Sequence, residues 1–126
     1  MDLLQAMRQR HAVRAYGDQP IADHTLASLV QAIHDANDAS GLNIQLIHDA
    51  DDALSGCPTH YGRFKNVHAM LALIGSDSDS LDERVGYWGE RLALTAVSLG
   101  LDTSWAVLHD TAKEGCLWSL NDDERM

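Results

Sequence analysis

Residues 80–100, SLDERVGYWGERLALTAVSLG, predict one long helix that is apolar on more than one side. Ser80 and Glu83 stand at its start with the spacing of a capping box, and Gly100 supplies the C-terminal stop. Because so wide an apolar surface needs more than one neighbour to cover it, we expect this helix at the centre of the fold and in a homodimer interface. Its apolar positions are Leu81, Val85, Trp88, Leu92, Ala96 and Leu99, with Tyr87, Ala93, Leu94 and Val97 beside them.

Shorter elements are predicted on both sides of this helix. Residues 2–9 and a segment that begins at Asp23 have helical periodicity, each with an aspartate as the expected N-terminal cap. Residues 49–55 predict a further short helix, and residues 121–126 predict a polar turn with no returning strand. Strands are predicted at residues 43–47, 67–74 and 103–108, the second of them buried on both faces.

The 126 residues are expected to form one domain, 1–126. The formal charge of −10, from 9 basic and 19 acidic residues, argues against nucleic acid or an anionic membrane as a partner, because both need a basic surface. No apolar run approaches the ~18 residues of a membrane span, and no signal-peptide pattern opens the chain, so we expect a cytoplasmic protein. Cys57 and Cys116 are too few for a disulfide framework or a zinc knuckle. The seven histidines show no metal-binding spacing.

A basic motif, RHAVRAY, follows the first predicted helix at residues 10–16. It places the guanidinium groups of Arg10 and Arg14 and the imidazole of His11 within five residues. Cations of this kind bind phosphate groups. The plainer alternative is a solvated basic turn, because cations also suit the C-terminal end of a helix.

A second motif, SGLNIQ, lies at residues 40–45, where the first strand is predicted. Ser40 and Gly41 form a small turn, and Asn43 and Gln45 add carboxamides, which match the donor and acceptor edge of a heteroaromatic ring. The alternative is a polar loop that leads into an edge strand. Together the two motifs look like the phosphate end and the ring end of a flavin mononucleotide (FMN) site.

These motifs resemble the nitroreductase family, whose patterns are Arg-Arg/His-Ser-x-Arg/Lys-x-Phe/Tyr and Ser-Ser/Gly-x-Asn-x-Gln. A small branch of nitroreductase-like proteins also carries Gly-Tyr-Tyr-Gly-Glu-Arg and Thr-Cys-Trp, similar to GYWGER at residues 86–91 and TSW at 103–105. With YGRFKNV at residues 61–67, the matches run in the same order along nearly the whole chain. One departure is Ala12, where the family has a hydroxyl residue, so one phosphate hydrogen bond of about 1 kcal/mol is expected to be missing.

The resemblance implies an α+β fold, with a mixed, mainly antiparallel sheet flanked by helices, and an FMN-dependent oxidoreductase. Electrons would pass from NAD(P)H through the flavin to a nitro compound, a quinone or a related small-molecule acceptor in a ping-pong cycle, with no catalytic side chain required. The Ser40 turn and Asn43 would approach the flavin from the partner subunit. The implied cofactor-binding residues are Arg10, His11, Arg14, Ser40, Gly41, Asn43, Gln45, Lys65 and Trp105.

A rival interpretation comes from another class of protein. The resembled family continues beyond a segment like residues 121–126, with another strand and usually a cationic segment, so the chain is expected to be truncated relative to its relatives. Such a chain, with Ala12 in place of the hydroxyl residue, would bind flavin weakly or not at all and act only as a dimeric binding module. The set of cations and amides opposes this alternative, and a visible absorption spectrum distinguishes the two.

Overall fold

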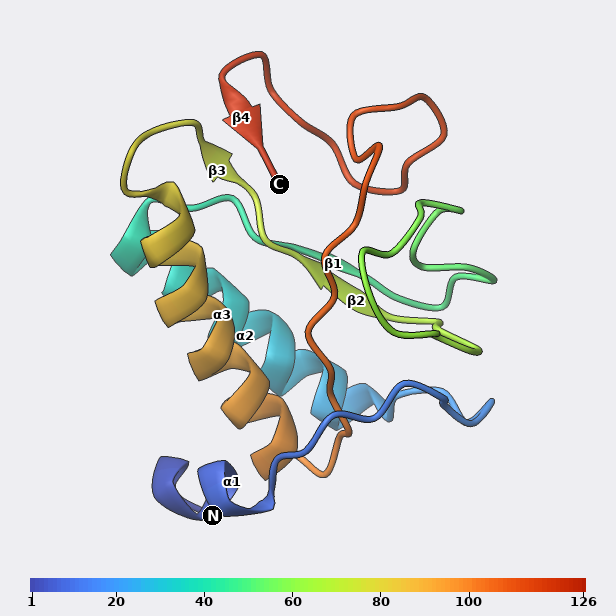
Figure 1. The fold of residues 1–126 in the computed structure, drawn as a ribbon. Helices are drawn as coiled ribbons and strands as arrows, with labels where there is room; N and C mark the ends of the chain where they lie inside the picture. Colours follow the sequence, from blue (N-terminus) through green and yellow to red (C-terminus); the bar gives the residue numbers. More distant parts are fainter.

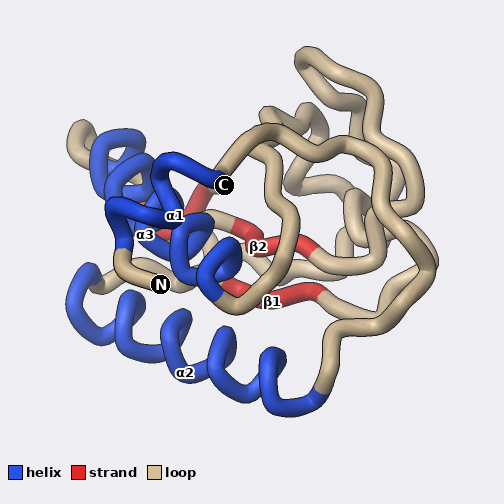
Figure 2. The backbone as a smooth tube through the Cα atoms, turned by 90° about the horizontal axis from the view of Figure 1, so that it is seen from below, coloured by secondary structure: helices blue, strands red, loops and turns tan.

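The computed structural model describes residues 1–126 as an α+β fold, which confirms the predicted fold class. Helices α2 and α3 lie side by side, and α1 packs against α3 (Figure 1). The helices gather on one side of the molecule, while long irregular segments fill the other (Figure 2). The elements are α1 Leu3–Gln9, α2 Asp23–Ser40, β1 Gln45–Ile47, β2 Met70–Ala72, β3 Gly75–Ser76, α3 Leu81–Ser98 and β4 Glu124–Arg125.

The sheet is smaller than the sequence predicts, although its central segment is buried as expected. Strand β2 pairs antiparallel with β1 only, and β3 pairs antiparallel with β4. Of the predicted strand 67–74, Leu73 packs against the cluster formed by the helices. Ala72 and Ile74 are fully buried and belong to a second cluster with Trp118. This segment therefore contacts apolar side chains on both faces, as a strand inside a core does.

The larger apolar cluster joins α2 to α3. Because the apolar residues of both helices recur every three or four positions, they form one continuous apolar stripe on each helix, and the two stripes pack against each other. Helix α3 also contacts α1 and β3, so its predicted central position is confirmed. The buried members of this cluster are Leu29, Ile33 and Ala36 of α2, Leu42 and Ile44 of the following segment, and Leu81, Leu92 and Ala96 of α3.

The starts of α1 and α2 differ in how they are capped. The Asp2 side chain accepts the Gln5 backbone N–H at 2.8 Å, and the Gln5 side chain accepts the Asp2 N–H at 3.0 Å. The predicted N-cap of α1 is therefore confirmed. The predicted N-cap of α2 was wrong: Ala22 is the capping residue, and Asp23 is the first helical residue, where its charge suits the positive end of the helix.

The long helix α3 starts without the predicted capping box. Ser80 has φ −96° and ψ 0°, a helical rather than an extended conformation, and its side chain makes no capping hydrogen bond. The C-terminal stop is as predicted. Gly100 has a φ of 86°, and the Leu101 N–H donates to the Ala96 carbonyl at 3.0 Å, which completes a Schellman motif.

Two predictions for the irregular half of the chain were wrong. Residues 49–55 form turns rather than a helix, and the residues at the two ends of this segment, Asp49 and Ser55, adopt left-handed φ values of 52° and 57° that no right-handed helix contains. Residues 103–108 do not form a strand, since the neighbouring segments approach them at single residues only. Those contacts are isolated bridges, parallel between Thr103 and Ala12 and antiparallel between Leu108 and Thr59.

The C-terminal residues also differ from the prediction. Residues 121–126 were expected to lack a returning strand, but β4 pairs with β3 and places Arg125 opposite Gly75. The Arg125 guanidinium meets Asp77 at 2.7 Å and Asp82 at 3.0 Å. These ion pairs attach the C-terminal strand to the segment before α3 and to the first turn of α3.

Candidate functional site

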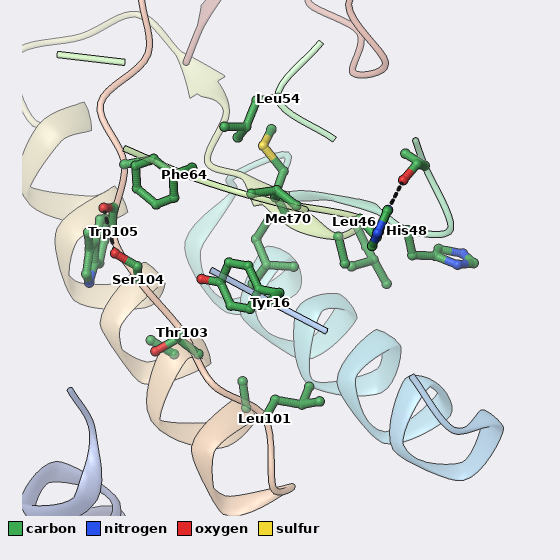
Figure 3. Close-up of a pocket in the computed structure, with 18 of the residues that line it drawn as sticks. Tyr16, Leu46, His48, Leu54, Phe64, Met70, Leu101, Thr103, Ser104 and Trp105 are labelled. Carbon is green, nitrogen blue, oxygen red and sulfur yellow. Dashed lines mark hydrogen bonds between the residues drawn. The ribbon is translucent and has the colours of Figure 1, made fainter. Parts of the chain in front are cut away.

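A cavity of about 980 Å³ lies between α3 and the irregular segments that cross in front of it. This volume is at the upper end of the ~300–1,000 Å³ typical of small-molecule sites. Tyr16, Phe64 and Trp105 bring aromatic rings to the wall, and most other lining residues are apolar (Figure 3). The cavity therefore suits a flat, largely apolar group with a few polar edges. Other lining residues drawn in Figure 3 include Leu46, Met70, Leu101, Thr103 and Ser104.

Trp105 is fixed in this wall by its neighbours on α3. Its indole Nε1 donates to Glu90 Oε2 at 2.7 Å, and Glu90 Oε1 lies 3.3 Å from Arg10 Nε. A Cβ added at Gly89 would come within 2.7 Å of the indole ring and 2.8 Å of Leu73. Glycine at this helical position therefore makes room for Trp105, and Glu90 connects the indole to the basic motif.

The cationic side chains of the basic motif lie outside the cavity, although Tyr16 at the end of the motif lines it. His11 is exposed, and its Nδ1 is 3.1 Å from the Gln9 carbonyl. The exposed Arg14 side chain lies over Gly62, where an added Cβ would come within 3.0 Å of the guanidinium Nε. The Lys65 N–H donates to the Arg14 carbonyl at 2.8 Å, so these two cations sit on neighbouring backbone segments. Neither the Arg14 nor the Lys65 side chain forms an ion pair, so both charges are free to bind an anion.

Two buried polar atoms near this motif have no hydrogen-bond partner. They are Arg10 Nη1 and Thr103 Oγ1. The two segments that carry them are joined, because the Val13 N–H donates to the Thr103 carbonyl at 3.0 Å and Ala12 is bridged to Thr103. An unpaired buried polar group costs about 1–3 kcal/mol. Both atoms therefore have unused hydrogen-bonding capacity.

The second motif is occupied by contacts within the chain. The Gln45 amide donates to the Ser119 carbonyl at 2.7 Å and accepts the Ser119 N–H at 2.9 Å. The Asn43 amide donates to Glu124 Oε1 at 3.3 Å. The turn before them ends α2, with Gly41 in the left-handed region at φ 74°. These amides attach the C-terminal segment to β1 and do not line the cavity.

A family model described as "Putative TM nitroreductase" matches residues 2–126. The chain belongs to this nitroreductase family. The resemblance inferred from the motifs is confirmed, and the chain is a nitroreductase-like oxidoreductase. No curated protein and no solved structure matches this nitroreductase-family chain.

Of the residues that the resemblance implies for the cofactor site, Trp105 alone lines the cavity of this nitroreductase-family chain. Arg10 is linked to Trp105 through Glu90, whereas His11, Arg14 and Lys65 lie on the outer segments. The Ser40–Gln45 motif is held against the C-terminal segment. One chain therefore presents the aromatic wall and the basic motif, and keeps the amide motif apart from both.

Sequence reasoning missed four residues that shape this site: Tyr16, Phe64, Glu90 and Thr103. All four lie inside motifs quoted from the sequence, but motif spacing does not indicate which side chains meet across the fold. Burial raises the pKa of the Tyr16 phenol, the Asp102 carboxylate raises it further, and the Arg14 guanidinium lowers it. The phenol therefore keeps its proton at neutral pH and can donate a hydrogen bond in the cavity.

No group of three or more histidine, cysteine, aspartate or glutamate side chains converges in a way that could hold a metal ion. None of the helices combines the length and the apolar character that crossing a membrane requires.

Proposed function

We propose that this nitroreductase-family chain is an FMN-dependent oxidoreductase that passes electrons from NAD(P)H to a nitro compound, a quinone or a related small acceptor. The family match over residues 2–126 is the observation that carries the proposal. Bound FMN would supply the redox chemistry, while the protein binds it, orients it and shields it from water. No side chain is required as an acid or a base.

The hydrogen-bond donors around the basic motif are of the chemical types that bind a phosphate group such as that of FMN. Arg10 and Arg14 bring two guanidinium groups, and His11 an imidazole, into a chain whose formal charge is −10, and Lys65 is hydrogen-bonded to the same segment. Guanidinium groups suit phosphate because they donate two hydrogen bonds in a planar arrangement. Thr103 adds an unpaired hydroxyl beside Ala12, where the family pattern has a hydroxyl residue. We assign the phosphate to these side chains.

The aromatic wall of the cavity suits the flavin ring. Tyr16, Phe64 and Trp105 offer flat surfaces for offset stacking or edge contacts. The protonated phenol of Tyr16 can donate to a ring heteroatom. We therefore propose that the cavity holds the ring next to the basic motif, with Glu90 keeping Trp105 in place.

The remaining cofactor contacts are proposed to come from a second copy of the chain. The resemblance implies that the turn at Ser40 and Gly41, together with Asn43, approaches the flavin from the partner subunit. Exposed apolar side chains offer a surface for dimer formation on α1 and α3, which pack together. Leu4 and Met7 of α1 are 63% and 57% exposed, and Tyr87 of α3 is 57% exposed. Sedimentation showing a monomer at micromolar concentration would contradict this dimer and the shared site.

One observation favours a second candidate, a dimeric binding module without flavin activity. The amides of Asn43 and Gln45 already bond the C-terminal segment of their own chain. A cofactor that used them would have to replace these hydrogen bonds. Ala12 removes a further phosphate contact. The two candidates differ in one measurable property, which is whether the folded chain binds FMN.

Absorption spectroscopy tests the proposal. The purified chain is expected to show the visible flavin bands, at least in part, and the stripped chain is expected to regain them with FMN. Riboflavin, which lacks the phosphate, is the control ligand and should bind more weakly. Adding NADH or NADPH without oxygen should bleach the bands, and a nitro compound or quinone should restore them. A folded chain that binds no FMN at millimolar concentration would leave the binding-module candidate.

A further inference from the structure

Two cysteines that lie far apart in the sequence meet on the irregular side of the fold. The Sγ atoms of Cys57 and Cys116 are 4.0 Å apart, although 59 positions separate the residues. Both are free thiols in the structure. A disulfide bond is about 2 Å long, so a small movement of either loop would join them. This pair is outside the proposed flavin site, and the inference below does not depend on that site.

Hydrogen bonds on both sides of the thiols hold the two loops together. The His109 N–H donates to the Pro58 carbonyl at 2.8 Å. The Leu117 N–H donates to Ser55 Oγ at 3.1 Å. The Asp110 carbonyl lies within 3.7 Å and 4.0 Å of the two sulfur atoms. The thiols are therefore positioned by the fold and do not meet through chance mobility of a surface loop.

We propose that Cys57 and Cys116 form a redox-active pair that a small-molecule disulfide, such as oxidised glutathione, converts to an intramolecular disulfide. The partly exposed Cys116 attacks one sulfur of the small disulfide, releasing one thiol and leaving a mixed disulfide. Cys57 then attacks Cys116 Sγ, and the second small thiol leaves. The two protein thiols are oxidised to one disulfide, the small disulfide is reduced to two thiols, and those thiols take up the two protons.

The surroundings of the two sulfur atoms support this order of attack. Cys57 is buried at 6% exposure, whereas Cys116 is partly exposed and can be reached by a small oxidant. Burial, followed by the adjacent Cys116 thiol, raises the pKa of the Cys57 thiol, and the Lys113 ammonium lowers it. The Cys57 thiol is therefore the weaker of the two nucleophiles at neutral pH by burial alone, and the partly exposed Cys116 reacts first. In a reducing compartment, a disulfide of this kind is transient, and the fraction of chains that carry it follows the ratio of oxidised to reduced small thiols.

Mass spectrometry of the full chain tests the proposal. The chain is equilibrated in buffers of graded oxidised-to-reduced glutathione ratio, and its free thiols are then alkylated. The wild type is expected to lose two hydrogens and both alkylation sites as the ratio rises. The Cys57→Ser variant is expected to accumulate a glutathione adduct on Cys116, because no second thiol can displace it. The Cys116→Ser variant is expected to keep Cys57 unmodified.

Thermal unfolding gives a second, independent measurement. A disulfide that closes a loop of this length without strain should raise the unfolding midpoint of the oxidised wild type by roughly 8–15 °C. Neither single variant should show this rise. The proposal is overturned if the folded wild type keeps two free thiols in fully oxidised glutathione, or if it forms disulfides only between chains. A disulfide that lowers the midpoint would also overturn it, because the thiols would not be positioned for bonding.

Discussion

Trp105 and Glu90 are joined by a hydrogen bond of 2.7 Å from the indole Nε1 to the carboxylate Oε2. The other oxygen of the same carboxylate lies 3.3 Å from Arg10 Nε. Trp105 faces the cavity, and Arg10 belongs to the basic motif that is proposed to bind phosphate. One side chain of α3 therefore links the aromatic wall to the cationic segment.

Replacing Glu90 should separate its two roles. Glu90→Leu leaves the indole N–H and the Arg10 guanidinium without their acceptor, which should lower the free energy of unfolding by about 1–3 kcal/mol. Glu90→Gln keeps an acceptor for Trp105 and removes only the charge. Because the ion pair is partly exposed, that loss should be about 0–1 kcal/mol. Urea unfolding followed by tryptophan fluorescence measures both variants, and equal losses would contradict the assignment.

The two glycines of the GYWGER segment should respond in opposite directions to alanine. Gly89→Ala places a methyl group within 2.7 Å of the Trp105 ring and 2.8 Å of Leu73, so overpacking should cost about 1–3 kcal/mol. Nothing lies within 4 Å of a Cβ at Gly86, so Gly86→Ala should stabilise the helix by about 0.5–1 kcal/mol. Thermal unfolding of this matched pair gives the comparison. A Gly89→Ala chain as stable as Gly86→Ala would show that the indole does not need this space.

The helical half of the fold could be predicted from the sequence because its signals are local. The apolar repeat of residues 80–100 and the stop at Gly100 both depend on positions a few residues apart. The capping box was mispredicted because the spacing of Ser80 and Glu83 does not report the backbone conformation at Ser80. The spacing of two residues indicates which capping hydrogen bonds they could form. The backbone conformation of the residues that enter the helix decides which of these hydrogen bonds form.

The irregular half could not be predicted because its contacts join distant segments. Thr103 lies beside Ala12, the Gln45 amide bonds Ser119, and Cys57 lies beside Cys116. Each contact joins two segments whose relative positions depend on the packing of the whole chain. The motifs therefore identified the family, but they did not show that the amide motif is engaged within its own chain.

His68 should titrate above the usual range of a histidine. Its Nδ1 faces the Ala50 carbonyl at 2.7 Å, and its Nε2 faces Asn66 Oδ1 at 2.9 Å. The Ala50 hydrogen bond is the main cause that raises the His68 pKa, and the Asp18 carboxylate at 3.6 Å raises it further, while desolvation lowers it. The protonated ring is favoured because both nitrogens can then donate.

The sign of the pH dependence follows from that shift. The contribution of His68 to stability is fully present below its unfolded pKa and is lost as the pH rises through the raised folded pKa. The pKa of Asp18 is lowered, chiefly by the Asn66 hydrogen bond, so its contribution is lost only as the pH falls through the folded value. An NMR titration should show the raised His68 pKa, and Asp18→Asn should reduce but not abolish the shift. A His68 pKa at or below the ordinary value would contradict the two hydrogen bonds.

Arg14 should distinguish the phosphate from the ring of the cofactor. Arg14→Ala should weaken FMN binding by roughly tenfold or more, because the complex loses a charge-assisted hydrogen bond worth ~1.5–3 kcal/mol. Riboflavin should bind the variant and the wild type alike. Flavin fluorescence titration measures both ligands. An Arg14→Ala chain that holds FMN as tightly as the wild type would remove Arg14 from the phosphate site.

The final prediction concerns the hydroxyl groups beside the basic motif. Thr103 Oγ1 is buried without a partner next to Ala12, so Thr103→Val, which keeps the shape of the side chain, should leave the free energy of unfolding unchanged or slightly higher. If this hydroxyl serves the phosphate, the same variant should weaken FMN binding by about 1 kcal/mol, roughly fivefold. Ala12→Ser should tighten FMN binding by a similar amount, and should restore the affinity lost in Thr103→Val.

The wild type, with one hydroxyl fewer than the family pattern, is expected to purify with part of its flavin sites empty. A Thr103→Val chain that unfolds more easily but binds FMN normally would show that the hydroxyl serves the fold. A protein that purifies with FMN fully bound, and whose affinity does not change in Ala12→Ser, would show that the phosphate is held elsewhere.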